Sequence, residues 1–268
     1  MASKNGSASS YAQVIEHVFL SHFKKGMKEF SFSRDEITDA VEELKIPRPK
    51  NIGDVVYSFR YRKGLPASIM KTQPSGHEWI IEGAGTAMYK FRLVPRSRIL
   101  PQKSMMPIKI PDATPEIIGS YALGDEQALL AKVRYNRLID IFLGITAYSL
   151  QNHLRTTVKG IGQIEIDEIY VGVDKHGRQY VIPVQAKGGS DQHGVVQTTQ
   201  DIACCVAKFQ NLICRPVSVQ FVTPTKIAMF ELVELDGEIK LADEKHYHLV
   251  PASNITVNDL SLYSRSCK

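Results

Sequence analysis

The chain has 268 residues, of which 43% are hydrophobic and 23% charged, and its formal net charge is +5 at pH 7. This composition is that of a soluble globular protein with room for two ordinary domains, and it argues against a disordered chain. No window approaches the roughly 18 consecutive apolar residues of a membrane-spanning helix, and the first residues lack the apolar core of a signal peptide. The four cysteines have no CxxC or Cys/His ligand spacing, so neither a disulfide framework nor a structural zinc is expected. We therefore expect a cytoplasmic protein with no membrane partner.

The charge is distributed unevenly along the chain. Residues 1–110 hold 18 Lys and Arg against 10 Asp and Glu, whereas residues 111–268 hold 15 against 18. A basic segment followed by an acidic one suggests an anion-binding module joined to a domain whose carboxylates hold cations. The alternative is solubilising charge distributed by chance.

The first 95 residues contain three predicted helices and a hairpin. Residues 11–23 place apolar side chains at helical spacing. Ser33, with Glu36 three positions later, has the pattern of a capping box and predicts a second helix. A third helix is expected over residues 51–64. Residues 76–94 alternate and turn at "EGAG", which is typical of a β-hairpin.

This order of elements resembles a winged-helix domain, and we assign residues 1–95 to such a mainly α-helical, DNA-binding domain. In winged helices the third helix commonly enters the major groove and the hairpin flanks the backbone. The resemblance implies a set of candidate DNA contacts: Arg60, Arg62, Lys63, Lys71, Lys90 and Arg92. Ordinary solvated charges, or a winged helix that binds protein, remain alternatives.

Residues 96–115 are predicted to be a proline-rich linker, because five prolines interrupt any regular pattern between positions 95 and 115. Residues 116–268 form the second predicted domain. Residues 124–158 are helical in pattern, with a bend near Gly144. A strand hairpin, another helix and three further strands follow, the last two strands linked by Asp236 and Gly237. We expect an α/β domain with a mixed sheet flanked by helices.

Two carboxylates and an amide-lysine pair occupy the predicted hairpin of this domain. In "QIEID", Glu165 and Asp167 point to one face of the strand, because side chains alternate along a strand. In "YVIPVQAK", Gln185 and Lys187 share one face in the same way. Pairing of the two strands brings Asp167 near Gln185 and Lys187. Hard oxygen ligands of this kind suit Mg²⁺.

The pattern of an acid followed eighteen positions later by "QAK" resembles the PD-(D/E)xK motif of restriction endonucleases and related repair nucleases. The resemblance implies that Asp167 is a metal ligand, that Gln185 occupies the second ligand position, and that Lys187 orients or deprotonates the attacking water. The chain departs from the motif in two places. Ile166 precedes Asp167 instead of Pro, and Gln185 replaces the usual acid, which leaves only an amide oxygen to ligate.

Further residues are candidates for the same site. Glu165 lies on the face of Asp167 and could replace the charge lost at Gln185. Glu126 begins the helical stretch before the strands, where the family often places an additional acid, although stabilisation of the helix N-terminus is an equal alternative. Gln197 and Gln200 lie about one turn apart in the following helix and could reach the site or DNA.

The resemblance implies a restriction-endonuclease-like domain and a Mg²⁺-dependent endonuclease that hydrolyses double-stranded DNA. The compact size and the absence of a GxxxxGK[ST] motif favour a type II restriction endonuclease over a motor-driven nuclease. Family likeness alone implies a homodimer. The alternative is a non-catalytic DNA-binding regulator with a degenerate nuclease-like domain.

Overall fold

The computed structural model describes residues 6–61, 64–95, 99–121, 126–159, 161–188 and 194–265. The chain forms two compact units, which are Met1–Arg96 with Thr157–Gln163, and Ser97–Thr156 with Ile164–Lys268. Within the described ranges, no helix has both the length and the apolar character needed to cross a membrane.

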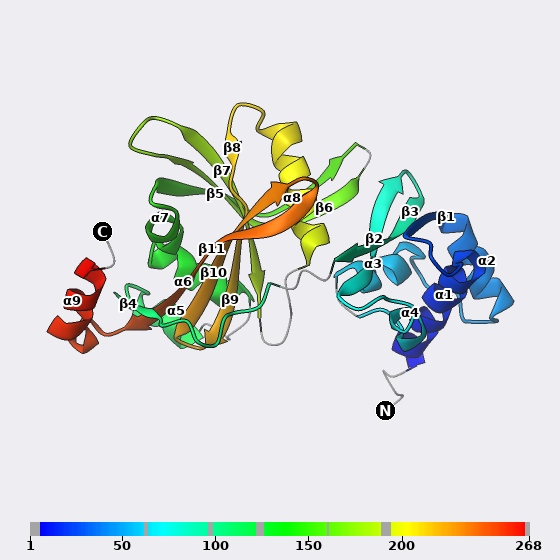
Figure 1. Cartoon of the computed structure of the whole chain (residues 1–268), viewed down its shortest axis with the longest axis horizontal. Helices are drawn as coiled ribbons and strands as arrows, with labels where there is room; N and C mark the ends of the chain where they lie inside the picture. The colour runs from blue at the N-terminus through cyan, green and yellow to red at the C-terminus, as the bar shows by residue number, and fades with distance from the viewer. Residues whose placement is uncertain are drawn as a thin grey trace. The chain divides into compact units, whose positions relative to one another are not determined.

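The first unit combines helices with a small antiparallel sheet. Its elements are α1 (Gly6–His22), β1 (Glu29–Ser33), α2 (Arg34–Glu43), α3 (Gly53–Tyr61), α4 (Ala67–Met70), β2 (His77–Gly85) and β3 (Met88–Pro95). The three strands lie in the order β1-β3-β2, so β3 is central (Figure 1). The predicted hairpin is confirmed by the antiparallel pairing of β2 with β3.

An aromatic cluster fills the core between these helices and the sheet. Phe19 of α1 is fully buried, and its ring lies 5.0 Å from that of Phe91, 5.3 Å from that of Phe30 and 5.3 Å from that of Trp79. All three contacts are edge-on, which is a favoured geometry for aromatic pairs. One residue of α1 therefore joins the helix to all three strands.

The capping box predicted at the start of the second helix is confirmed. The Ser33 hydroxyl accepts a hydrogen bond from the Glu36 backbone at 3.2 Å, and the Glu36 carboxylate accepts one from the Ser33 backbone at 2.8 Å. His22 contacts the same carboxylate. The pKa of Glu36 is lowered, because the Ser33 backbone and His22 outweigh the opposing effect of burial.

The prediction of a mainly α-helical winged-helix domain is wrong. Strand exceeds helix among the residues that the structure describes, and the first unit contains a three-stranded sheet as a structural layer. The element that the sequence analysis missed is β1, whose sequence "EFSFS" buries only Phe30 and Phe32. Alternation over five residues is too short to be recognised without the strand beside it.

The second unit is built on a curled eight-stranded sheet (Figure 1). Its strands are β4 (Ile108–Pro111), β5 (Thr146–Val158), β6 (Gly162–Val173), β7 (Gln179–Lys187), β8 (Ile213–Cys214), β9 (Val217–Thr223), β10 (Lys226–Leu235) and β11 (Glu238–Val250). The order along the sheet is β4-β11-β10-β9-β7-β6-β5, and the short β8 pairs with β7. The pairs β10 with β11, β10 with β9 and β6 with β7 are antiparallel, whereas β7 pairs in parallel with β9 and with β8, and β11 with β4.

Helices cover both faces of this sheet. The unit's helices are α5 (Glu116–Tyr121), α6 (Glu126–Tyr135), α7 (Leu138–Leu143), α8 (Val195–Lys208) and α9 (Val257–Arg265), with a 3₁₀ turn, η1, at Ala252–Asn254. Buried residues of α6 and α7 pack in one cluster with Ile182, Val184 and Ala186 of β7. Side chains of α8 pack in another cluster with Ala228 and Phe230 of β10.

The expected α/β, restriction-endonuclease-like fold is also overturned, because a curled eight-stranded sheet dominates the unit. The largest local difference is β5, which was predicted as the second half of a helix over 124–158. Gly144 ends α7 in the left-handed conformation (φ 65°), and the chain then continues as a thirteen-residue strand. Glycine is the residue that adopts this conformation most readily, so the expected bend at Gly144 is a helix end.

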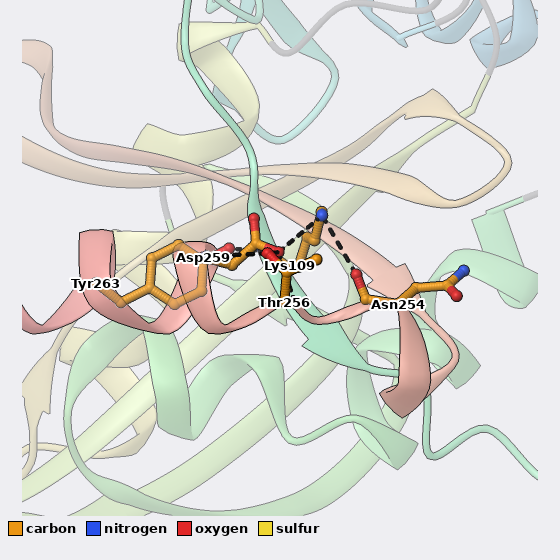
Figure 2. A network of polar contacts seen from close by, with 5 residues as sticks. All are labelled: Lys109, Asn254, Thr256, Asp259 and Tyr263. Carbon is orange, nitrogen blue, oxygen red and sulfur yellow. Dashed lines mark hydrogen bonds and ion pairs between the residues drawn. The ribbon is translucent and has the colours of Figure 1, made fainter.

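The segment predicted as a linker contributes to the second unit. Ile108–Pro111 is strand β4. Figure 2 shows the contacts of Lys109, on this strand, with the segment that contains the C-terminal helix α9. The Lys109 ammonium lies 2.9 Å from the Asp259 carboxylate, and its backbone N–H donates to the Tyr263 hydroxyl at 2.9 Å. Hydrogen bonds from Thr256, together with Lys109, lower the pKa of Asp259 to about 2. Strand β4 and helix α9 are therefore joined by an ion pair and by hydrogen bonds.

The aromatic core of the first unit predicts a large effect of truncation at Phe19. The Phe19→Ala variant should lower the free energy of unfolding of this unit by about 3–5 kcal/mol, because a buried ring is replaced by a cavity. Chemical denaturation followed by tryptophan fluorescence measures this, since Trp79 lies in the same cluster. Leu20→Ala is the matched control. Leu20 is 53% exposed on the same helix, so its truncation should cost about 0.5 kcal/mol or less.

Candidate functional site

The pairing of β6 with β7 builds the candidate site. The strands are antiparallel, with Glu168 opposite Val184 in the register, so Asp167 lies at the level where β7 approaches its end. The backbone N–H of Ala186 donates a hydrogen bond of 2.8 Å to Asp167 Oδ2. The Asp167 carboxylate is thereby fixed against the "QAK" segment, as the sequence analysis expected.

Lys187 extends the site toward the helix on one side of the sheet. Its side chain is only 14% exposed, and its Nζ lies 3.8 Å from Oε1 of Glu126, the first residue of α6. Three predicted residues, Asp167, Lys187 and Glu126, therefore come together although they belong to three different elements. The Glu126 side chain is 40% exposed, so this ion pair is open to solvent on one side.

The environment of Asp167 makes its ionised form costly. Burial raises the pKa of Asp167, and the negative charge of Glu165 adds to this effect. The hydrogen bond from Ala186 and the charges of Lys187 and His153 act in the opposite direction without cancelling it. A carboxylate in such a place gains stability from any cation that binds to it.

Gln185 does not have the accessible position that the motif implies for a metal ligand. It is 3% exposed, and its Nε2 lies 3.1 and 3.0 Å from the two carboxylate oxygens of Asp201. The same nitrogen donates to the Glu165 backbone carbonyl at 3.1 Å. Its Oε1 accepts a hydrogen bond of 2.8 Å from Gln197 Nε2. Gln185 thus connects strand β7 to helix α8 through a buried polar layer.

Asp201 is the residue that the sequence analysis missed. It lies on α8, is 1% exposed, and faces the Gln185 amide with both oxygens. Burial raises the pKa of Asp201 well above its ordinary value, and the charge of Asp167 contributes in the same direction. One signal was available, because Asp201 follows Gln197 by four residues, so that both lie on the same face of α8.

The remaining candidates are placed around this centre. The Glu165 carboxylate lies 3.0 Å from Arg155 and 4.0 Å from His153, both on β5. Gln197 reaches the site through Gln185, as described. Gln200 is buried on α8. The negative charge of Glu165 also acts on the neighbouring Asp167 carboxylate.

The donor set offers Mg²⁺ few protein ligands. Across the described ranges, no group of three or more His, Cys, Asp and Glu side chains is arranged to hold a metal ion. Mg²⁺, however, usually binds one or two carboxylates and fills its other positions with water and substrate phosphate. The Asp167 carboxylate fits that requirement, because it is buried and the positive charges near it only partly compensate for this burial. The Gln185 oxygen does not, because it already accepts a hydrogen bond from Gln197.

The six candidate DNA contacts have different environments. Arg62 and Lys63 lie outside the described residues, Arg60 is half-buried on α3, and Lys71 is exposed. Lys90 lies 3.2 Å from Glu29, and two nitrogens of Arg92 donate to Glu82 at 3.0 and 2.6 Å. The Glu82 hydrogen bonds raise the pKa of Arg92. Lys90 and Arg92 thus form ion pairs across the small sheet.

Comparisons of the chain with family models, with curated proteins and with solved structures give no match. The class of protein is therefore inferred from the geometry of the site.

The contact between Gln185 and Asp201 predicts that restoring the acid of the motif is harmful. The Gln185→Glu variant should lose about 1–3 kcal/mol of stability or more at pH 8, because the Asp201 carboxylate loses its donor and faces a second carboxylate. A proton shared by the two acids is bound more tightly in the folded protein than in the unfolded chain. The defect should therefore shrink as the pH falls toward 5. Thermal unfolding at both pH values measures this.

Two controls separate this effect from a general loss of stability. In an Asp201→Asn background the Gln185→Glu substitution should cost much less, because the second charge is gone. Gln179→Glu, at the exposed start of the same strand, should be nearly neutral. An equal cost of Gln185→Glu with and without Asp201 would show that the two side chains do not interact.

Proposed function

We propose that the chain is a Mg²⁺-dependent endonuclease that hydrolyses phosphodiester bonds of double-stranded DNA. The observation that carries this proposal is the meeting of Asp167 and Lys187 at adjoining positions of two paired strands, with Glu126 beside Lys187. A carboxylate and an ammonium at one sheet end, with a second carboxylate from a helix, provide both a cation site and a positive group for a phosphate. The likeness to the PD-(D/E)xK motif supports the same chemistry.

In this proposal different residues of the chain bind the metal ion and orient the attacking water. Asp167 would hold the Mg²⁺, which supplies a bound water of lowered pKa and neutralises charge developing on the phosphate. Lys187 would orient the attacking water and donate a hydrogen bond to a phosphate oxygen in the transition state. Glu126 restrains the Lys187 ammonium by its ion pair. Ala186, through its backbone N–H, keeps the Asp167 carboxylate in place.

A type II restriction endonuclease is the most specific form of this proposal. The first 110 residues carry a net positive charge, and most of them belong to the first unit, which we call the basic unit. This unit would bind the phosphates, while the second unit would cut the duplex. Cutting both strands of a duplex by one such site per chain is most simply achieved by a two-fold symmetric homodimer, because the two strands are themselves related by a two-fold axis.

A non-catalytic DNA-binding regulator is the second candidate, and one observation favours it. Gln185 stands at the second ligand position of the motif. Its amide nitrogen donates to Asp201, and its amide oxygen accepts from Gln197. A site reduced to one carboxylate ligand binds Mg²⁺ more weakly than one with two. The cleavage assay below distinguishes the two candidates.

The proposed mechanism predicts that Asp167→Ala and Lys187→Ala each lower the rate of plasmid cleavage by about 10²- to 10⁴-fold. DNA affinity should change little, because neither side chain belongs to the basic unit. Gel electrophoresis of plasmid incubated with Mg²⁺ measures cleavage, and a chelator should abolish it. Lys175→Ala, in the exposed turn of the same hairpin, is the matched control and should cut normally. An absence of Mg²⁺-dependent cleavage by the unaltered chain would favour the regulator.

The basic unit predicts a salt-dependent affinity for duplex DNA. If Arg60, Arg62 and Lys63 bind phosphates, replacing each by Gln should reduce the slope of log K against log salt by roughly 0.9. A base contact would instead cost about 1–3 kcal/mol at the cognate site alone. Fluorescence anisotropy at several salt concentrations measures both. Lys90→Gln should have a smaller effect on the slope, because Glu29 already neutralises Lys90. Binding that is insensitive to salt would remove DNA as the partner of this unit.

A further inference from the structure

Two cysteine side chains contact each other where helix α8 packs against strand β8 (Figure 1). Cys205 lies in the last turn of α8, and Cys214 is the second residue of β8. Both are free thiols in the structure, and the Cys205 thiol forms a hydrogen bond with the Cys214 side chain. Two thiols in contact are a pair that oxidation can join, which a single cysteine is not.

Backbone hydrogen bonds hold both cysteines in place. The backbone N–H of Phe209 donates to the Cys205 carbonyl at 2.8 Å and closes the end of α8. Strand β8 pairs in parallel with β7, with Cys214 opposite Val181, and the backbone N–H of Arg215 donates to the Val181 carbonyl at 3.0 Å. A cysteine side chain is short, so the contact between the two sulfurs is set by these backbone positions.

The cysteines differ in their access to solvent. Cys214 is half-buried and lines a pocket of about 420 Å³ between α8, β8 and the turn that joins β10 to β11. Cys205 is 1% exposed, and Cys204 beside it is fully buried. A small reagent therefore reaches Cys214 first. The exposed carboxylates of Glu234 and Asp236 also line the pocket, so they favour an uncharged reagent over an anionic one.

The protonation of Cys205 gives the same order of reaction. Its hydrogen bond with Cys214, together with burial, raises the pKa of Cys205, so this thiol stays protonated at neutral pH. The thiolate is the form of cysteine that attacks an oxidant. Cys205 is thus suited to react second, with a Cys214 sulfur that has already been oxidised.

We propose that Cys205 and Cys214 form a reversible disulfide when the chain meets hydrogen peroxide. The Cys214 thiolate attacks one peroxide oxygen, the O–O bond breaks, and a sulfenic acid and hydroxide form. The Cys205 sulfur then attacks the Cys214 sulfur, and the S–O bond breaks. The departing hydroxyl takes the Cys205 proton and leaves as water. Two thiols are oxidised to one disulfide, and the peroxide is reduced to two waters.

The disulfide would fasten the C-terminal end of α8 to the sheet. Asp201 precedes Cys205 by four residues, so the two lie on the same side of the helix. The helix that bonds Gln185 through Asp201 would therefore be restrained at its far end by a covalent bond. This inference goes beyond the proposed nuclease, because it uses neither a metal ion nor DNA.

Peptide mapping of the full chain after treatment with hydrogen peroxide tests the proposal. Cys267 lies outside the described residues and is replaced by Ser in every sample, so that it forms no disulfide of its own. Free thiols are alkylated, and the chain is digested with trypsin without a reducing agent. Because trypsin cuts after Lys208, the disulfide links the peptide that ends at Lys208 to the peptide that contains Cys214. We expect mass spectrometry to find this linked pair, and dithiothreitol to abolish it.

The melting temperature gives a second measurement on the same samples. The oxidised chain should melt about 5 °C higher than the reduced chain, because the disulfide constrains the unfolded state. Glutathione disulfide carries negative charge and should oxidise the pair about tenfold more slowly than hydrogen peroxide at equal concentration. Equal rates would show that Glu234 and Asp236 do not select the oxidant.

Three variants identify the sulfurs that react. Cys204→Ser is the matched control, because Cys204 is buried on the same helix but points about 100° away from Cys205 around its axis. It should still give the linked pair, whereas Cys205→Ser and Cys214→Ser should each lower the yield about tenfold or more. Cys214→Ser changes a half-buried side chain, so its reduced form should melt like the unaltered chain. No linked pair from the unaltered chain, or an undiminished yield from Cys205→Ser, would overturn the proposal.

Discussion

The antiparallel pairing of β6 with β7 is the constraint on which the candidate site depends. It brings Asp167 within hydrogen-bonding distance of the Ala186 backbone, and so places a carboxylate beside Lys187 without any direct bond between the two side chains. Because β7 also pairs in parallel with β9, the strand is held on both edges and cannot shift its register alone. The geometry of the charged groups is therefore set by backbone hydrogen bonds, which are insensitive to salt.

Helix α8 adds a buried polar layer to this arrangement. The layer makes the arrangement rigid, and it makes the loss of any one of its polar side chains costly in stability. Gln185, Asp201 and Gln197 form one chain of hydrogen bonds from the sheet to the helix. In a low-dielectric interior such a chain is strong while every member is satisfied, and removal of one member leaves an uncompensated group. The amide of Gln185 is neutral, so it can lie against Asp201 where a second carboxylate would repel it. The presence of an amide instead of an acid at position 185 thus has a physical reason within this fold.

Features set by neighbouring residues could be predicted from the sequence, and features set by distant ones could not. The capping box at Ser33 and the turn at Asp236 and Gly237, both with positive φ, are local and were predicted correctly. Asp167 and Lys187 were also grouped, because strand alternation places them at one end of the paired strands, whereas Glu126 was added only through the resemblance to the nuclease family. Strand β5 was mistaken for helix, since most of its side chains are exposed and give no clear period. The pairing of β4 with β11, far apart in the sequence, and the contact of Asp201 with Gln185 depend on tertiary structure.

Strand β6 presents successive residues to opposite faces of the sheet, with Asp167 toward the polar layer and Glu168 toward Arg134 of α6. An insertion or deletion of one residue in this strand would exchange the two faces, and would place a buried acid in the wrong environment on each side. Length changes in β6 therefore damage both faces at once, so natural variants of this chain should keep the strand's length. Differences in binding or chemistry between such variants would then arise in α6 and α8, where each face can change independently.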